Sequence, residues 1–117
     1  MRALDARQST QVVNASTVPS PLPTGPLVVD GVFGHLTCAA LQRSLNEHHG
    51  EHLDVDGSCG RLSYSALQRA LGVEITGQRD EATVKALQRR LGVARVDGVW
   101  GPDTVERLQV ALNAGQF

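Results

Sequence analysis

The chain has 117 residues, of which 41% are hydrophobic and 20% charged, so its length suits one ordinary domain. Its formal net charge of −1 argues against an electrostatic nucleic-acid binder, because such proteins carry a clustered surplus of lysine and arginine. No apolar run approaches the roughly 18–20 residues of a membrane span, and the N-terminal stretch lacks the apolar core of a secretory signal.

Residues 1–26 are expected to form an extended arm or linker. Four of the five prolines lie between Pro19 and Pro26. Proline removes amide donors and restricts φ, so this segment cannot pair inside a sheet. The residues from Gln8 to Thr17 are polar and small, with no sustained period. We therefore place the folded domain at residues 27–117.

From residue 27 onward the chain repeats a unit made of a loop and a helix. The copies are VDGVFGHLTCAALQRSLN (29–46), VDGSCGRLSYSALQRALG (55–72), ITGQRDEATVKALQRRLG (75–92) and VDGVWGPDTVERLQVALN (96–113). Apolar residues recur at i, i+3 and i+7 in each copy, which gives every helix one apolar stripe. Helices this short are marginal alone in water, so the stripes should stack together. We predict an all-α domain of four short helices with DGxxG loops and little or no sheet.

Capping residues indicate where these helices begin and end. Asp80 is a strong N-cap, and Pro102 suits the first helical position. Glycine and asparagine tolerate the left-handed conformation that ends a helix. Helix ends are therefore expected at one equivalent position of the four copies: Asn46, Gly72, Gly92 and Asn113.

The loops and the repeated glutamines have structural roles in this interpretation. Each loop aspartate can accept hydrogen bonds from amides just downstream, and the glycine after it permits positive φ. All four copies keep a glutamine, which favours a bond to a neighbouring loop's backbone over contact with a ligand. The threonines of the first helical turn are expected to satisfy local backbone groups. The residues concerned are Asp30, Asp56, Asp97, Gln42, Gln68, Gln88, Gln109, Thr37, Thr83 and Thr104.

The DGxxGxxTxxALQxxL pattern resembles the peptidoglycan-binding domain of actinobacterial and actinobacteriophage cell-wall hydrolases. The resemblance covers residues 27–117 and is closest in the first and last copies. It implies non-catalytic adhesion to peptidoglycan, hence action at the bacterial cell wall. Members usually form a three-helix unit with two loops, whereas four loops and four helices here indicate two fused units or one extended unit.

Site residues are expected in the first and last copies, where the pattern is most complete. Phe33 and Trp100 occupy equivalent loop positions, either as platforms for a sugar's C–H face or as plugs over the helix starts. The other copies depart from the pattern, with Cys59, Ser63, Thr76, Arg79 and Asp80 at family positions, which makes their loops weaker candidates. The predicted ligand-binding residues are Asp30, Phe33, Thr37, Asp97, Trp100 and Thr104.

Other chemistry-bearing residues receive ordinary interpretations. The run from Glu47 to His52 contains three histidines, but a polar loop needs no metal to explain it, and we expect no metal and no cofactor. Cys38 is expected as a small core residue, while a disulfide with Cys59 stays open. Arg43, Arg69, Arg89 and Arg90 form either a solvated helix face or a basic stripe toward wall carboxylates. No nucleophile, base and orienting residue come together, so we expect no enzyme.

An alternative function belongs to a different class. Residues 1–26 could anchor the chain on a phage capsid or tail, so that the repeat domain decorates the virion. Because no signal peptide is recognised, a phage-encoded or virion-associated protein is expected in either case. A third reading is a fragment or independently translated tail of a lysin. The expected partners are peptidoglycan and, for the arm, a virion or lysin component.

Overall fold

The computed structural model describes residues 25–117, and most of the predicted arm, residues 1–24, lies outside them. The described part contains the helices α2 (His35–His49), α3 (Arg61–Leu71), α4 (Glu81–Leu91) and α5 (Pro102–Asn113), and no strand. The all-α prediction is confirmed. Among these residues no helix is long and apolar enough to cross a membrane.

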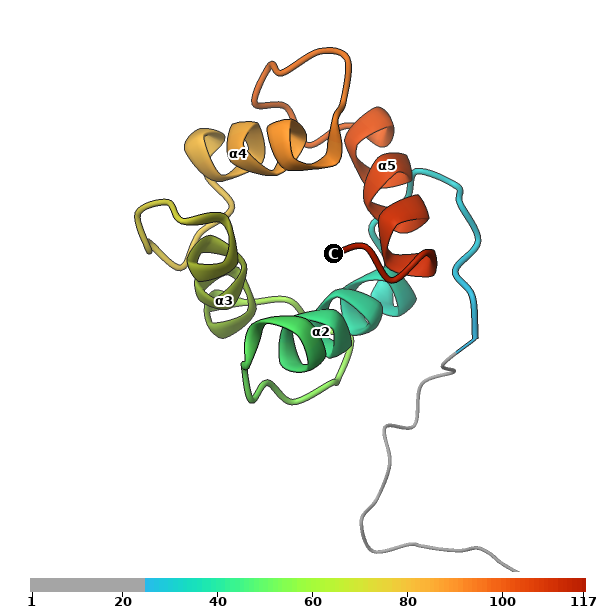
Figure 1. The fold of residues 1–117 in the computed structure, drawn as a ribbon, viewed down its shortest axis with the longest axis vertical. Coiled ribbons are helices and arrows are strands. Elements are labelled where there is room, and N and C mark those ends of the chain that lie inside the picture. Colours follow the sequence, from blue (N-terminus) through green and yellow to red (C-terminus); the bar gives the residue numbers. More distant parts are fainter. Residues whose placement is uncertain (1–24) are drawn as a thin grey trace, which may run out of the picture.

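The four helices close into a ring (Figure 1). Each helix packs against the next one along the chain, and α5 also packs against α2. The predicted leucine stripes meet in one hydrophobic core, so the first and last repeats are neighbours in space. The core consists of Leu41, Leu45, Ala66, Leu67, Leu87, Leu108 and Phe117.

The C-terminal segment turns into the middle of this ring (Figure 1). Phe117 is only 3% exposed. His49 Nε2 lies 2.6 Å from the main-chain oxygen of Phe117, and the Arg90 guanidinium carbon lies 5.3 Å from the centre of the Phe117 ring. Since His49 and Arg90 belong to the last turns of α2 and α4, Phe117 closes the core beside the C-terminal ends of these helices.

Most predicted helix signals are confirmed. The Asp80 side chain caps α4 by accepting a hydrogen bond from the Thr83 N–H at 3.1 Å, and Pro102 is the first residue of α5. Gly72 and Gly92 end α3 and α4 in the left-handed conformation. These glycines are required where the chain turns sharply into the next loop.

The helix end predicted at Asn46 is wrong, whereas the end predicted at Asn113 is confirmed. α2 continues to His49 and ends at Gly50, which has φ of 72°, while Asn113 is the last helical residue of α5. The Asn46 side chain instead accepts from the Leu53 N–H at 2.7 Å and donates to the Leu53 carbonyl at 2.9 Å. Asn113 pairs in the same two ways with Leu27. Because an amide side chain carries both a donor and an acceptor, it tethers the chain that enters a loop.

Candidate functional site

Each repeated glutamine holds the loop that precedes a neighbouring helix. Gln88 Oε1 accepts from the Gly98 N–H at 2.9 Å. Its Nε2 donates to Asp97 Oδ1 at 3.0 Å, to the Val99 carbonyl at 3.1 Å and to Thr104 Oγ1 at 2.9 Å. All four glutamines are at most 1% exposed. We call this arrangement the glutamine clamp, and its geometry confirms the structural role predicted for these residues.

The clamp of the last helix closes the ring. Gln109 Oε1 accepts from the Asp30 and Gly31 N–H groups, both at 3.0 Å. Its Nε2 donates to Asp30 Oδ1, the Val32 carbonyl and Thr37 Oγ1 at 3.0, 3.1 and 3.0 Å. The first loop, 77–79 residues away in sequence, is therefore held as the loops between adjacent helices are held.

The third copy preserves the clamp with different residues. Thr76 stands where the other loops have aspartate, and its Oγ1 accepts from Gln68 Nε2 at 2.8 Å and from the Gln78 N–H at 3.2 Å. Its hydroxyl also donates to Asp80 Oδ2 at 2.9 Å. The loop therefore keeps its shape although its sequence departs from the repeat.

Four of the six predicted site residues belong to these clamps. Asp30 and Asp97 accept from their glutamines and from amides two residues downstream, while Thr37 and Thr104 are buried beneath them. Hydrogen bonds from Gln109 and then from the Val32 N–H lower the pKa of Asp30. For Asp97, the Val99 N–H and then Gln88 lower the pKa. These four side chains thus stabilise the loops.

The two predicted aromatic residues meet although they lie in different loops. The rings of Phe33 and Trp100 are in edge-to-face contact, with centroids 5.1 Å apart. The Arg79 guanidinium carbon lies 4.6 Å from the centre of the Trp100 ring and 5.9 Å from that of Tyr64. We call Phe33, Tyr64, Arg79 and Trp100 the aromatic–arginine cluster.

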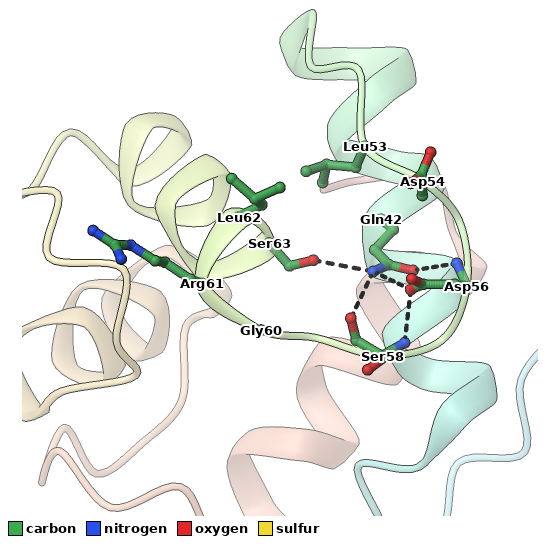
Figure 2. Close-up of a pocket in the computed structure, with 9 residues that line it drawn as sticks. All are labelled: Gln42, Leu53, Asp54, Asp56, Ser58, Gly60, Arg61, Leu62 and Ser63. Carbon is green, nitrogen blue, oxygen red and sulfur yellow. Dashed lines mark hydrogen bonds between the residues drawn. The ribbon is translucent and has the colours of Figure 1, made fainter.

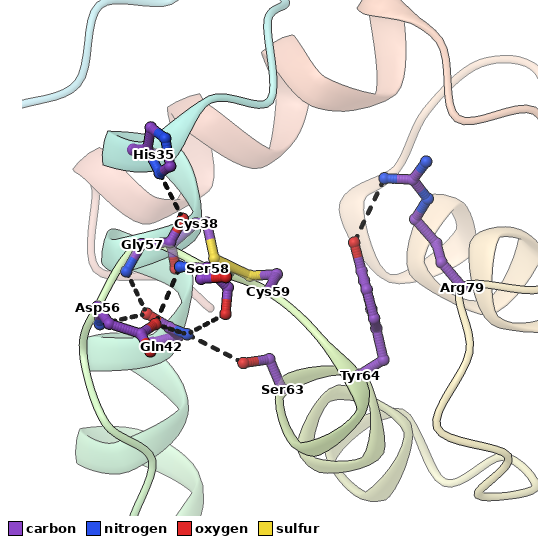
Figure 3. The surroundings of a disulfide bond; sticks show 10 residues. All are labelled: His35, Cys38, Gln42, Asp56, Gly57, Ser58, Cys59, Ser63, Tyr64 and Arg79. Atoms are coloured by element: carbon purple, nitrogen blue, oxygen red, sulfur yellow. Dashed lines mark hydrogen bonds between the residues drawn. A yellow bond between two sulfur atoms is a disulfide. The ribbon is translucent and has the colours of Figure 1, made fainter.

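A disulfide joins the helix and loop beside this cluster. Cys38 of α2 and Cys59 of the second loop are bonded, with Cα atoms 5.9 Å apart, so the pairing left open by the sequence is formed. Next to it lies a hollow of about 300 Å³, whose lining includes the disulfide and the aromatic residues Phe33 and Tyr64. Figure 3 shows the disulfide and Tyr64. The lining residues are Phe33, Gly34, His35, Cys38, Gly57, Ser58, Cys59 and Tyr64.

A second hollow of about 230 Å³ lies between the second loop and the start of α3 (Figure 2). Its polar lining is engaged in a clamp, because Gln42 donates to Asp56 Oδ1, to the Ser58 carbonyl and to Ser63 Oγ at 3.0–3.2 Å. The hollow beside the disulfide has two aromatic residues in its lining, which this one lacks, and is the better candidate for a ligand site.

The polar run from Glu47 to His52, which the sequence predicts as a loop, begins in the last turn of α2 and makes contacts within the protein. Glu51 forms an ion pair with Arg69 at 2.8 Å, and this bond is the main cause that lowers the pKa of Glu51. His48 lies 3.4 Å from Ser44 Oγ. No three metal-ligating side chains come together anywhere in residues 25–117.

Tyr64 and Arg79 were not predicted as site residues. From the sequence, Tyr64 belongs to the apolar i, i+3, i+7 spacing of its helix, and Arg79 is a departure from the repeat. An alignment of the four copies gives a signal for Arg79, because this residue aligns with Phe33, Cys59 and Trp100. These four loop positions converge at one end of the core.

Comparisons with protein-family models, with curated proteins and with solved structures gave no match for this chain.

Proposed function

We propose that this domain binds bacterial cell-wall peptidoglycan and does not react with it. The observation that carries the proposal is the hollow beside the disulfide, with Phe33 and Tyr64 in its lining. Aromatic rings stack on the C–H faces of sugars, while nearby polar groups orient the ligand. The Ser58 hydroxyl and the second ring nitrogen of His35, whose Nδ1 lies 2.9 Å from the Gly57 carbonyl oxygen, provide such polar groups in the same hollow.

Two further observations support this proposal. The repeated DGxxG loops resemble those of peptidoglycan-binding domains, and the clamps explain how such loops keep one shape. Disulfides persist in oxidising surroundings outside the cytosol, which suits a domain that acts at the cell wall. The same disulfide leaves neither Cys38 nor Cys59 as a thiol nucleophile, in keeping with binding alone.

Within this proposal the predicted site residues have two different roles. Phe33 and Trp100 belong to the binding surface, and Tyr64 joins them. The clamp residues shape the loops that present these rings, and make no contact with the ligand in this proposal. They are Asp30, Thr37, Asp97 and Thr104.

The test is a pull-down with peptidoglycan sacculi from several bacteria. We expect the wild-type protein to bind and the Phe33→Ala/Tyr64→Ala variant to lose binding, since each ring stacked on a sugar contributes about 1 kcal/mol. Leu62→Ala is the matched control, because Leu62 is 75% exposed and lies outside this hollow. Circular dichroism and thermal melting check that each variant is folded.

A Phe33→Leu variant keeps the apolar volume and removes only the aromatic face, so it answers the question even if the double variant unfolds. Binding that survives in folded Phe33→Leu and Phe33→Ala/Tyr64→Ala proteins contradicts the assignment of the hollow. If the wild-type protein binds no sacculus, the proposed function is wrong, and virion assembly becomes the function to test.

A further inference from the structure

Arg79 is a cation held in place by two aromatic rings. Its guanidinium carbon lies 4.6 Å from the centre of the Trp100 ring and 5.9 Å from that of Tyr64, although the side chain is exposed. Cation–π attraction and stacking hold a guanidinium flat against such a ring. The position of this charge is therefore set before any ligand arrives.

The charge of Arg79 is not neutralised by a carboxylate within the described residues. Its one hydrogen bond there runs from Nη1 to Tyr64 Oη, at 3.4 Å. Arg69, by contrast, is paired with Glu51. A guanidinium has five N–H donors in its plane, and Arg79 uses one of them on Tyr64, so this exposed side chain keeps donors for a planar, two-oxygen acceptor.

Packing alone does not explain an arginine at this position. The equivalent residues of the other loops are Phe33, Cys59 and Trp100, all of which are apolar and partly buried. Tyr64 both lines the hollow beside the disulfide and accepts the bond from Arg79. Figure 3 shows the Tyr64 hydroxyl pointing at the guanidinium, which places the cation beside one wall of that hollow.

We propose that Arg79 binds a carboxylate of the ligand that occupies this hollow. The inference rests on the proposed function and narrows its ligand class to an anionic glycopeptide, as opposed to a neutral glycan chain. Arginine and carboxylate form paired, charge-assisted hydrogen bonds that a neutral amide cannot reproduce. Free carboxylates of the wall peptides or of the sugar substituents both carry this chemistry.

The experiment compares native sacculi with sacculi whose carboxylates have been converted to neutral amides by carbodiimide and ethanolamine. Binding is measured at about 0.15 M salt, where long-range attraction between exposed charges is screened. We expect the wild-type protein to bind the blocked sacculi about tenfold more weakly. Arg79→Gln should lose about tenfold on native sacculi and be insensitive to blocking.

Arg89→Gln is the matched control. It removes the same charge from an exposed arginine of α4, and we expect it to behave like the wild-type protein on both surfaces. It also tests whether a basic helix face, and not Arg79, provides the attraction. A loss in Arg89→Gln equal to that in Arg79→Gln overturns the inference.

The remaining outcomes separate this inference from the proposed function. Equal binding of the wild-type protein to native and blocked sacculi overturns the role of Arg79 and leaves peptidoglycan binding intact. The Arg79→Gln variant could instead bind both kinds of sacculi more weakly than the wild-type protein and still bind blocked sacculi more weakly than native ones. That result assigns Arg79 to packing and also overturns the inference. If the wild-type protein binds neither surface, both proposals are wrong.

Discussion

Replacing Gln109 tests whether the glutamine clamps hold the ring closed. Gln109→Ala removes five hydrogen bonds, four to the first loop and one to Thr37 of α2. A net worth of about 1 kcal/mol for each bond, reduced where the exposed loop regains water, gives a loss of about 3–5 kcal/mol. Because domains of this size are stable by about 5–15 kcal/mol, this one side chain supports much of the fold. Urea unfolding followed by circular dichroism measures the loss.

Gln109→Glu makes the same test at nearly constant volume. The introduced carboxylate would face Asp30 Oδ1 and the Val32 carbonyl, to which the Gln109 amide now donates. The nearby Asp30 carboxylate raises the folded-state pKa of the new carboxyl above its unfolded value. The folded protein then binds the extra proton more readily, so the deficit should shrink as pH falls from 7 toward 5.

The matched control is Gln116→Glu, which adds the same charge at an exposed glutamine. We expect it to unfold like the wild-type protein at both pH values. A Gln109→Ala loss below about 1 kcal/mol, or a Gln109→Glu protein that behaves like Gln116→Glu, would refute the reasoning that the clamp closes the ring.

Two further predictions concern the disulfide and acid. The disulfide closes a loop with a sequence separation of 21 residues, which should contribute about 3 kcal/mol to the free energy of unfolding. A Cys38→Ser/Cys59→Ser variant should therefore unfold at a lower urea concentration, and equal urea midpoints would contradict this. The clamp and cap aspartates have folded-state pKa values below their ordinary value of 3.8. Their contribution to stability is complete above 3.8 and is lost progressively as pH falls from 3.8 through the lowered folded-state values. We expect a lower thermal midpoint at pH 3 than at pH 6, whereas an unchanged midpoint would contradict the assignment. These aspartates are Asp30, Asp56, Asp80 and Asp97.

Local signals were sufficient to predict the helices and the clamp glutamines. Apolar spacing, Pro102 and the glycines at 72 and 92 act within a few residues, and the structure follows them. The end of α2 was predicted wrongly at Asn46, because an amide side chain serves equally well as a helix end and as a tether for a distant backbone. Nothing local distinguishes Asn46, which tethers Leu53, from a residue that ends α2.

Closure of the ring could not be read from the repeats. A row of loop–helix units predicts that each unit contacts its neighbours, but it does not say whether the last unit returns to the first. The deciding contacts join Gln109 to a loop more than 70 residues earlier. The cluster depends on the same closure, since Phe33 and Trp100 come from the first and last loops.

The closed ring also explains why the second and third copies can depart from the repeat without losing the fold. The clamp position is glutamine in all four copies, and Thr76 replaces aspartate without breaking the clamp. The loop position that converges beside the core varies instead, and provides Phe33, Cys59, Arg79 and Trp100. The constant glutamine clamp thus determines the stability of the fold. The four different side chains at the variable loop position make the surface of the four-repeat ring asymmetric. By this argument, changes at the variable position should alter what is bound, and changes to the glutamines should alter whether the domain folds.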